Sequence, residues 1–356
     1  MNRDVFDQRR GGVRPIDRSG VWRFREFVLD IDESQIITHP EGATRMYERD
    51  GIFFKHEGEN PTGSFKDRGM TVAITQAVRE GARAVACAST GNTSASAAAY
   101  AAQAGLRAIV FIPSGKISTG KLSQTIAYGA TILQVRGDFD AAMKLVLEAT
   151  KKLGIYLVNS INPFRLEGQK TIVWELLQDL EWNAPDWIVV PAGNLGNTSA
   201  FGKALIEARD RGWISKMPRI AAIQAHGANP FYRSFRENFA QRHRVQAGTV
   251  ASAIRIGDPV SFDKAVASIR ATNGIVEEVT DDELMQAKRD IDRMGIGCEP
   301  ASATTLAGVR KLRLKGSIVC VLTGHLLKDP DAIVRGEIIE IDPEISAVER
   351  ILATSR

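Results

Sequence analysis

The stretch D-W-I-V-V-P-A-G-N-L-G-N-T-S-A-F-G-K-A-L-I-E-A, residues 186–208, decides the fold class that the sequence predicts. Residues 186–192 form a short apolar run typical of a buried strand, residues 193–199 are rich in glycine and asparagine, and residues 200–208 favour a helix. A glycine-rich loop that leads into a helix presents backbone N–H groups to an anion, and its asparagine and hydroxyl side chains add neutral donors. The stretch therefore predicts a strand–loop–helix unit with a phosphate-binding loop.

The same alternation extends along most of the chain. Short apolar runs that read as strands are separated mainly by helical patterns, and there is no sequence repeat, low-complexity segment or flexible linker. The other expected strands cover residues 52–55, 84–88, 108–112, 131–135, 155–158, 220–224 and 318–322. Apolar strands that alternate with helices indicate mostly parallel sheets covered on both faces, so we expect an α/β protein.

The sequence gives poor support to a nucleoside triphosphate or a dinucleotide as the source of the phosphate that the loop at 193–199 would bind. No lysine follows Gly196 as a P-loop requires, and the G-x-G-x-x-G pattern of dinucleotide-binding proteins is absent. A cofactor that carries a phosphate group remains.

A second stretch, P-T-G-S-F-K-D-R-G-M at residues 61–70, places Lys66 where a helix should begin. Thr62 or Ser64 can cap this helix, which the run T-V-A-I-T-Q-A-V at residues 71–78 continues. The positive end of the helix dipole disfavours a protonated lysine in the first turn. A partly desolvated amine that loses its proton readily is what an imine-forming lysine needs, whereas the alternative is a solvated surface charge.

Two further strand ends carry polar groups. The strand at 84–88 runs into S-T-G-N-T-S-A-S (89–96), a loop suited to a carboxylate or phosphate, although a simple tight connection to the next helix explains it equally well. The strand at 318–322 ends in Thr323, whose hydroxyl should point into the crevice where open α/β sheets bind ligands. A lysine for an imine, a phosphate cup and a hydroxyl beyond a strand together indicate pyridoxal phosphate.

With these motifs in place, the chain resembles the threonine synthases, in the tryptophan-synthase-β-like (fold type II) group of pyridoxal-phosphate enzymes. The resemblance runs from about residue 20 to residue 328, and its motifs stand in the family's order and spacing. They are G-S-F-K-D-R-G-M (63–70), S-T-G-N-T-S-A-S (89–96), P-A-G-N-L-G-N (191–197) and L-T-G-H-L-L-K-D (322–329). Two departures are P-E-G-A-T-R-M (40–46) in place of the usual G-E-G-x-T-P-L, and Leu326 in place of the glycine of T-G-H-G-L-K-D.

The resemblance implies pyridoxal 5'-phosphate as the cofactor, with a defined set of contacts. Lys66 would bind it covalently as an imine, Asn92 would hydrogen-bond its ring hydroxyl, and Thr323 would face its pyridine nitrogen. Backbone N–H groups of five consecutive residues would hold its phosphate: Gly193, Asn194, Leu195, Gly196 and Asn197.

The resemblance also implies the reaction, the conversion of O-phospho-L-homoserine and water to L-threonine and inorganic phosphate, which is the last step of threonine biosynthesis. An enzyme of this kind is a carbon–oxygen lyase that acts on phosphates. The implied substrate contacts are Ser89, Thr90 and Thr93 for the carboxylate, and Asn159, Ser160 and Arg165 for the phosphate, with Lys66 and Thr93 nearby.

The implied architecture is two open, twisted, mostly parallel sheet lobes covered by helices, with the cofactor in the cleft between them. Residues 61–157 would form the smaller, mobile lobe that carries the loop for the substrate carboxylate. Residues 1–60 and 158–356 would form the larger lobe, which holds the cofactor phosphate. Closure of the smaller lobe would exclude water, and the family implies a homodimer.

The composition agrees with a cytoplasmic enzyme. The 356 residues are 44% hydrophobic, yet no apolar run is long enough to span a bilayer, and the N-terminus has no apolar signal region. The net charge of +4 is small and unclustered, so we expect no nucleic-acid or membrane partner. The three cysteines, Cys87, Cys298 and Cys320, are far apart in the sequence, and we expect them to be reduced thiols. The histidines and cysteines show no spacing typical of metal ligands.

Two other functions and several simpler residue roles stay open at this point. A serine or threonine dehydratase would use the same lysine and cofactor but would need no site for a substrate phosphate. A catalytically silent member would bind a phosphorylated ligand for regulation. Arg165 could pair with Glu167 on the surface, and Asp67 and Arg68 are expected to form a local ion pair.

Overall fold

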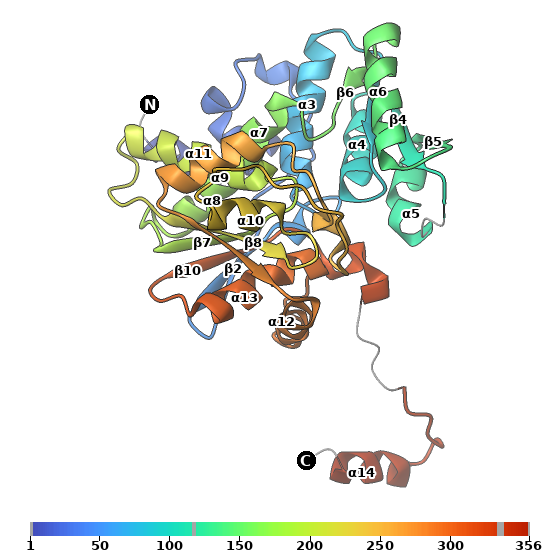
Figure 1. Ribbon diagram of the computed structural model, residues 1–356, viewed down its shortest axis with the longest axis vertical. Helices are drawn as coiled ribbons and strands as arrows, with labels where there is room; N and C mark the ends of the chain where they lie inside the picture. Colours follow the sequence, from blue (N-terminus) through green and yellow to red (C-terminus); the bar gives the residue numbers. More distant parts are fainter. Residues whose placement is uncertain (1–2, 116–118, 333–337, 355–356) are drawn as a thin grey trace.

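The computed structural model describes residues 3–115, 119–332 and 338–354, whose strands form two sheets (Figure 1). In the larger sheet, β1 pairs antiparallel with β2 and every other neighbouring pair is parallel. Its strands, in spatial order, are β1 (Met46–Arg49), β2 (Ile52–His56), β10 (Ile318–Leu322), β7 (Trp187–Pro191), β8 (Arg219–Ala225) and β9 (Ile275–Val279).

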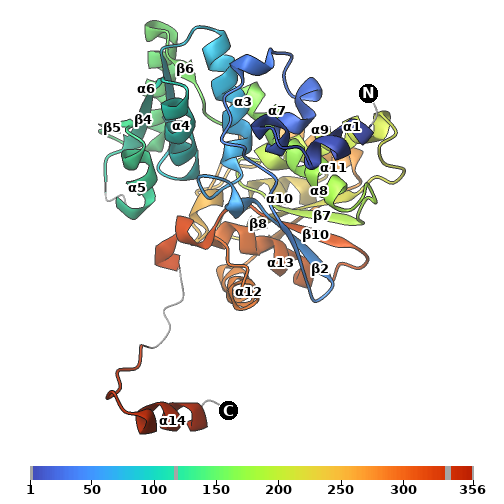
Figure 2. The ribbon, with the colours of Figure 1, turned by 180° about the vertical axis from the view of Figure 1, so that it is seen from behind.

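The smaller sheet is parallel throughout and comes from one continuous part of the chain. Its strands, in spatial order, are β5 (Thr131–Val135), β4 (Arg107–Pro113), β3 (Ala84–Ala88) and β6 (Tyr156–Leu157). Figure 2 shows this sheet with its helices on one side of α3 (Lys66–Arg79) and the larger sheet on the other side. The first residue of α3 is the predicted imine-forming lysine.

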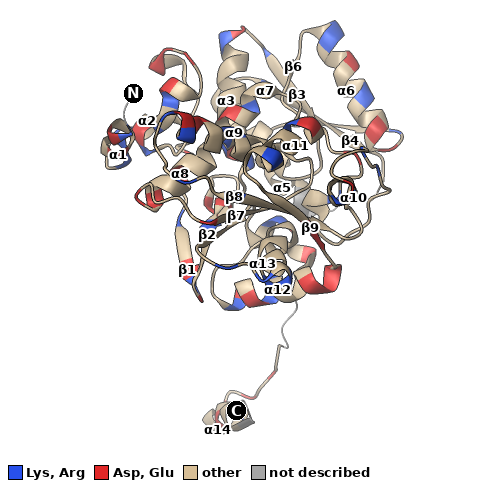
Figure 3. Cartoon of the chain, turned by 60° about the vertical axis from the view of Figure 1, so that its left-hand side comes forward, with Lys and Arg blue, Asp and Glu red and all other residues tan. Residues whose placement is uncertain are grey.

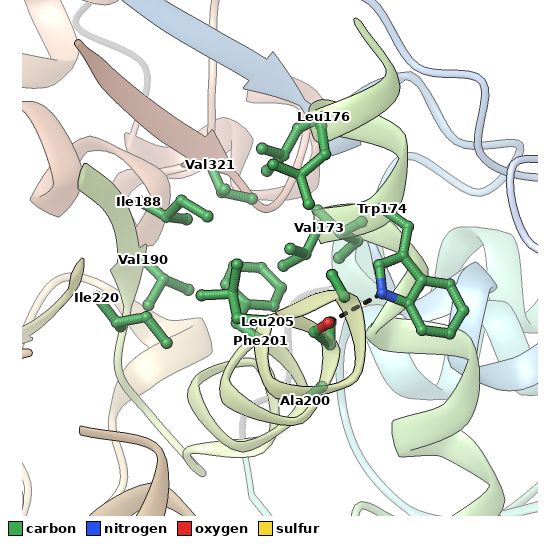
Figure 4. Packing of buried hydrophobic residues seen from close by; sticks show 14 of the residues in the cluster. Val173, Trp174, Leu176, Ile188, Val190, Ala200, Phe201, Leu205, Ile220 and Val321 are labelled. Atoms are coloured by element: carbon green, nitrogen blue, oxygen red, sulfur yellow. Dashed lines mark hydrogen bonds between the residues drawn. The ribbon is translucent and has the colours of Figure 1, made fainter. Parts of the chain in front are cut away.

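The larger sheet is covered on both faces because its strands are apolar on both faces. Along β7, Ile188 and Val190 face one core and Trp187 and Val189 face another. Figure 4 shows the first core, where Trp174 donates a hydrogen bond from Nε1 to the carbonyl oxygen of Ala204 at 3.0 Å. This core lies under α8 (Thr171–Asp179), α9 (Gly196–Asp210) and α11 (Phe262–Ala271), and the second lies under α12 (Asp281–Arg293) and α13 (Pro300–Leu312).

The remaining helices flank these two layers. Around the smaller sheet lie α4 (Asn92–Gln103), α5 (Thr119–Ala127) and α6 (Phe139–Leu153). The others are α1 (Asp4–Arg10), α2 (Pro15–Arg18), α7 (Pro163–Gln169), α10 (Pro230–Arg236) and α14 (Ile345–Thr354). Short 3-10 helices cover Trp22–Phe27, Glu33–Gln35, Glu57–Glu59, Ser252–Ile254, Leu326–Lys328 and Pro330–Ala332. Figure 1 draws α14 away from the body of the molecule.

Helices α3 and α7 approach closely because glycines face each other across their interface. A Cβ atom on Gly168 would lie 1.8 Å from the carbonyl oxygen of Arg68, and one on Gly69 would lie 2.9 Å from the carbonyl oxygen of Arg165. No side chain larger than hydrogen fits at Gly168 without displacing the backbone of α3. The contact therefore sets the position of α7 relative to the start of α3.

The predicted α/β fold with two mostly parallel sheets is confirmed, and every predicted strand is present. Strands β1 and β9, the two edge strands of the larger sheet, are not predicted by an apolar run in the sequence. An edge strand has one side open to solvent, so M-Y-E-R and I-V-E-E-V carry charges instead of the apolar run that identified the central strands.

The described helices are all too short or too polar to cross a membrane. Among the described residues no group of histidine, cysteine and acidic side chains could hold a metal ion. Figure 3 shows that helices α6 and α12 each carry both basic and acidic residues.

Candidate active site

The candidate site lies where the carboxyl ends of neighbouring parallel strands meet. In the larger sheet, β2, β10 and β7 are adjacent and lead to Lys66, to Thr323 and to the loop at 192–195 respectively. In the smaller sheet, β3 and β6 are adjacent and lead to residues 89–91 and 158–160. Because parallel strands end at the same edge of a sheet, residues far apart in sequence converge there.

Lys66 begins α3, and the backbone beside it is tied to the end of β10. The N–H of Phe65 donates to the carbonyl oxygen of Thr323 at 3.0 Å, and Nζ of Lys66 lies 4.3 Å from the centroid of the Phe65 ring. Of the two predicted caps, Ser64 approaches the helix, with Oγ 3.4 Å from the Lys66 nitrogen. Burial, and then the positive charge of Arg165, lower the pKa of Lys66 to about 7, so the amine is readily available at neutral pH.

The prediction that Asp67 and Arg68 pair with each other is wrong. Asp67 accepts hydrogen bonds from the N–H and hydroxyl of Thr62, at 2.7 and 2.6 Å. Arg68 pairs with Glu57 at 2.6 Å and with Glu175 at 2.9 Å. Consecutive side chains on a helix point in different directions, so each finds a partner on a different neighbouring element. These buried contacts anchor the first turn of α3 and the lysine that it carries.

Arg165, on α7, is a buried cation that forms no salt bridge with any acidic side chain in the described part of the chain. Its side chain is 1% exposed, and Nη1 donates to the carbonyl oxygen of Val158 at 3.3 Å. Nε and Nη2 have no hydrogen-bond partner among the described residues. The alternative of a surface pair with Glu167 is wrong, because Glu167 pairs with Lys170 at 2.6 Å and also with Lys203. A buried, uncompensated guanidinium beside Lys66 makes the site favourable for an anion.

Asn92 and Thr323 meet at a carboxylate that the sequence analysis did not single out. Nδ2 of Asn92 donates to Oε2 of Glu299 at 3.0 Å, and Oγ1 of Thr323 lies 3.2 Å from Oε1. Burial raises the pKa of Glu299. The signal that could have revealed it is a lone glutamate directly before Pro300 at a helix start, among small and apolar residues.

The loop after β7 has the geometry of an anion cup. Leu195 adopts φ of 64°, in the left-handed region, and α9 begins at the next residue. A Cβ atom on Gly193 would lie 2.9 Å from Cα of Ile254, so only glycine lets the loop sit this close to its neighbour. Oδ1 of Asn197 and Oγ1 of Thr198 are buried without a hydrogen-bond partner among the described residues. The Thr198 hydroxyl can donate a hydrogen bond to a phosphate at the start of this long helix, whereas the amide oxygen of Asn197 can only accept one.

The structure brings the two predicted phosphate sites together. Nδ2 of Asn194, in the loop after β7, donates to Oγ of Ser160 at 3.1 Å. Asn159 has a different contact, since its side-chain amide accepts from the Ala88 N–H at 2.9 Å and donates to the Ala88 carbonyl oxygen at 3.1 Å. Asn159 therefore holds the end of β3 against the chain after β6, and its role in substrate binding stays a prediction.

The residues predicted to hold the substrate carboxylate lie at the start of α4. Oγ of Ser89 accepts from the Gly91 N–H at 3.3 Å, while Thr90 and Thr93 are half-buried. Leu326, where the family has glycine, packs against Gly297, since a Cβ atom there would lie 2.3 Å from Cδ2 of the leucine. The leucine side chain thus occupies the space beside another glycine.

Comparisons with known proteins agree with this geometry. Residues 33–324 match the family model described as pyridoxal-phosphate dependent enzyme. The chain is 46% identical over 352 residues to the threonine synthase of Methanocaldococcus jannaschii, covering 94% of this chain and 87% of the relative. It is 43% identical to the threonine synthase of Methanosarcina acetivorans, covering 93% of this chain and 86% of the relative. The solved structure of threonine synthase from Escherichia coli has the same fold, with a TM-score of 0.75 at 19% identity, and covers all of this chain and 91% of that one.

Proposed function

Because the chain belongs to the pyridoxal-phosphate-dependent enzymes and, among them, to the threonine synthases, we propose that its cleft converts O-phospho-L-homoserine and water to L-threonine and phosphate through the residues around Lys66 and Arg165. The observation that carries the residue-level assignment is the buried guanidinium of Arg165 beside Lys66. Neither cation has a salt-bridge partner among the described residues, so an anionic substrate would supply the missing charge.

The residues present fit pyridoxal 5'-phosphate. The loop at 193–197 and the start of α9 would hold its phosphate, and Asn92 and Thr323 would hold the two sides of its ring. When bound, the cofactor supplies an electron sink that makes protons on the carbon atoms near the substrate amine removable. The protein supplies the orientation and the groups that move those protons.

Lys66 has the properties of the proton-transfer group. With its pKa lowered to about 7, its amine can take a proton from Cα or Cβ of the substrate and release it again at neutral pH. Its position at the buried start of α3 holds the amine in one place during successive transfers. Arg165 would bind the substrate phosphate and hold its leaving oxygen, with Ser160 as a neutral donor.

The phosphate site separates this function from the dehydratase alternative. A dehydratase acts on serine or threonine, which bring no phosphate to neutralise Arg165. The buried cation would then stay uncompensated through the whole reaction, at a cost of several kcal/mol. The charge balance of the site therefore favours the phosphorylated substrate.

We extend the proposal to lobe boundaries, assembly and location. Residues 61–157 act as the mobile lobe, which is supported by the continuous smaller sheet and by contacts across the cleft such as Asn92 to Glu299 and Lys328 to Gln124. The enzyme works as a homodimer in the cytoplasm. Light scattering of the purified protein tests the dimer, and a monomer at micromolar concentration would contradict it.

The test of the function is a product balance. The purified protein is incubated with pyridoxal 5'-phosphate and O-phospho-L-homoserine, and phosphate, threonine and 2-oxobutyrate are measured together, with Lys66→Ala as the control. Equal phosphate and threonine with little oxo acid is the expected result. Oxo acid formed from added threonine, without phosphate release from O-phospho-L-homoserine, would identify a dehydratase.

A further inference from the structure

Glu299 connects the two side chains assigned to the cofactor ring. Asn92 comes from α4, beside the smaller sheet, and Thr323 follows β10 of the larger sheet. Each interacts with a different oxygen of the same carboxyl group, at 3.0 and 3.2 Å. Glu299 is 4% exposed, and its own N–H donates to the carbonyl oxygen of Gly324 at 3.0 Å, so its position is set by its backbone as well.

The Thr323 hydroxyl has one proton and more than one possible acceptor. Its oxygen lies 3.1 Å from Oγ of Ser302, which itself accepts from the Gly324 N–H at 3.2 Å and can donate to Thr323. An ionised Glu299 only accepts, so it would take the single proton of Thr323. A protonated Glu299 can instead donate to Thr323, which leaves the threonine proton free to point into the cleft.

The groups around Glu299 have opposing effects on the protonation of its carboxyl group. Lys66 at the start of α3, Lys328 in the 3-10 helix and the N-terminus of α13 favour the ionised carboxylate. Burial is the strongest influence on Glu299 and favours its protonated form. The neighbouring Cys298 thiol is neutral, because burial holds the pKa of that thiol well above its usual range. The hydrogen bonds from Asn92 and Thr323 also favour the ionised form, and burial outweighs all of these influences, so the pKa of Glu299 is raised.

Resting on the proposed function, we propose that Glu299 is a positioning residue that keeps its proton at working pH and so directs the Thr323 hydroxyl proton toward the pyridine nitrogen of the cofactor. The nitrogen then accepts a hydrogen bond from a neutral group and stays unprotonated. An ionised Glu299 would reverse the hydrogen bond and offer the nitrogen only a lone pair. The carboxyl group thereby controls how strongly the cofactor withdraws electrons, without touching the substrate.

The protonation state is tested by infrared spectroscopy on protein labelled with ¹³C-glutamate at the side-chain carboxyl carbon, with and without bound cofactor. The glutamate label separates Glu299 from Asp67, a buried carboxyl whose pKa is also raised, to about 6. At pH 7 the spectrum should contain a protonated-carboxyl band that Glu299→Gln removes and that a rise in pH abolishes. Absence of that band from the wild-type protein at pH 7 would overturn the proposal. The wild-type titration uses no variant, so this result does not depend on whether Glu299→Gln folds.

The second readout is the absorption spectrum of the cofactor-loaded enzyme as a function of pH. Glu299→Gln should match the wild-type spectrum at pH 7 and lose the alkaline spectral shift, with turnover within about threefold of wild type, because glutamine is neutral and can donate to Thr323. Ser302→Ala, which removes the other neighbour of Thr323, should keep the shift. An alkaline shift that persists in Glu299→Gln would refute the proposal. Failure of the proposed function would instead appear as wild-type protein that forms no threonine, whatever the two spectra show.

Discussion

Replacement of Arg165 by methionine should separate stability from activity. The guanidinium is buried, one nitrogen donates to Val158 at 3.3 Å, and two have no partner among the described residues. In the free protein such a cation costs several kcal/mol of desolvation that nothing repays. In the substrate complex we assign the same cation to the substrate phosphate. Its removal should therefore spare the fold and damage the reaction.

The expected magnitudes follow from the unused donors of Arg165. Two hydrogen bonds from a charged group to a phosphate contribute about 1.5–3 kcal/mol each, or about 3–6 kcal/mol together. That corresponds to a loss in kcat/KM of between about 150-fold and about 20,000-fold. The free energy of unfolding of the protein without ligands should fall by less than about 1 kcal/mol, or rise, because the lost contact with Val158 is offset by the relief of a buried charge.

Urea unfolding and steady-state phosphate release measure the two quantities, with Arg68→Met as the matched control. Arg68 is equally buried but pairs with Glu57 and Glu175. Its loss removes the cation that pairs with Glu57 and one of the cations around Glu175, which keeps Lys55 at 2.7 Å, and should cost about 3–5 kcal/mol of stability. A third consequence is that the pKa of Lys66 rises in Arg165→Met, since Arg165 is the second cause of its lowering. Arg165→Met protein that loses as much stability as Arg68→Met, yet keeps its kcat/KM, would refute the assignment of Arg165 to the substrate phosphate.

Three other measurements test the site and the fold. Since the pKa of Lys66 is about 7 and only the neutral amine reacts, the rate of cofactor loading should be half-maximal near pH 7 and level off about one unit above it. A rise that continues to about pH 10 would mean an ordinary lysine. Thr323→Asp places an anion where the pyridine nitrogen is expected, so 2-oxobutyrate should increase relative to threonine, and an unchanged ratio counts against that contact. Gly168→Ala should lower the free energy of unfolding in urea by about 3 kcal/mol or more, because its Cβ would lie 1.8 Å from the Arg68 carbonyl oxygen. Gly11 has open space around it, so Gly11→Ala should change stability little. Equal effects of the two substitutions would contradict the tight contact between α3 and α7.

Much of the fold could be predicted because its signals are local. Central strands such as β7 and β10 are buried on both faces, so each appears as an uninterrupted apolar run that needs no knowledge of its neighbours. The edge strands β1 and β9 were missed for the opposite reason. Their residues are half-exposed and mix charged with apolar side chains, a pattern that only the adjacent strand organises into a sheet.

The residues of the candidate site also divide into those that local motifs predict and those whose contacts only the fold reveals. Motif spacing alone identified Lys66, the loop at 193–197 and Thr323, because each belongs to a single strand–loop–helix junction. The partners of charged groups could not be read from such junctions. Arg68 pairs with Glu175, which lies 107 residues away, and Asn92 donates to Glu299, which lies 207 residues away.

The sequence by itself thus determined the fold class and the cofactor and predicted the lysine that would bind it, because these depend on residue types within a few positions of each other. The tertiary structure decided which charges are neutralised: Arg68 is paired, two nitrogens of Arg165 have no partner among the described residues, and Glu299 is buried, which raises its pKa. The physical reason is that burial and charge pairing depend on distances in space between elements. Those distances exist only after the two sheets have brought their strand ends together.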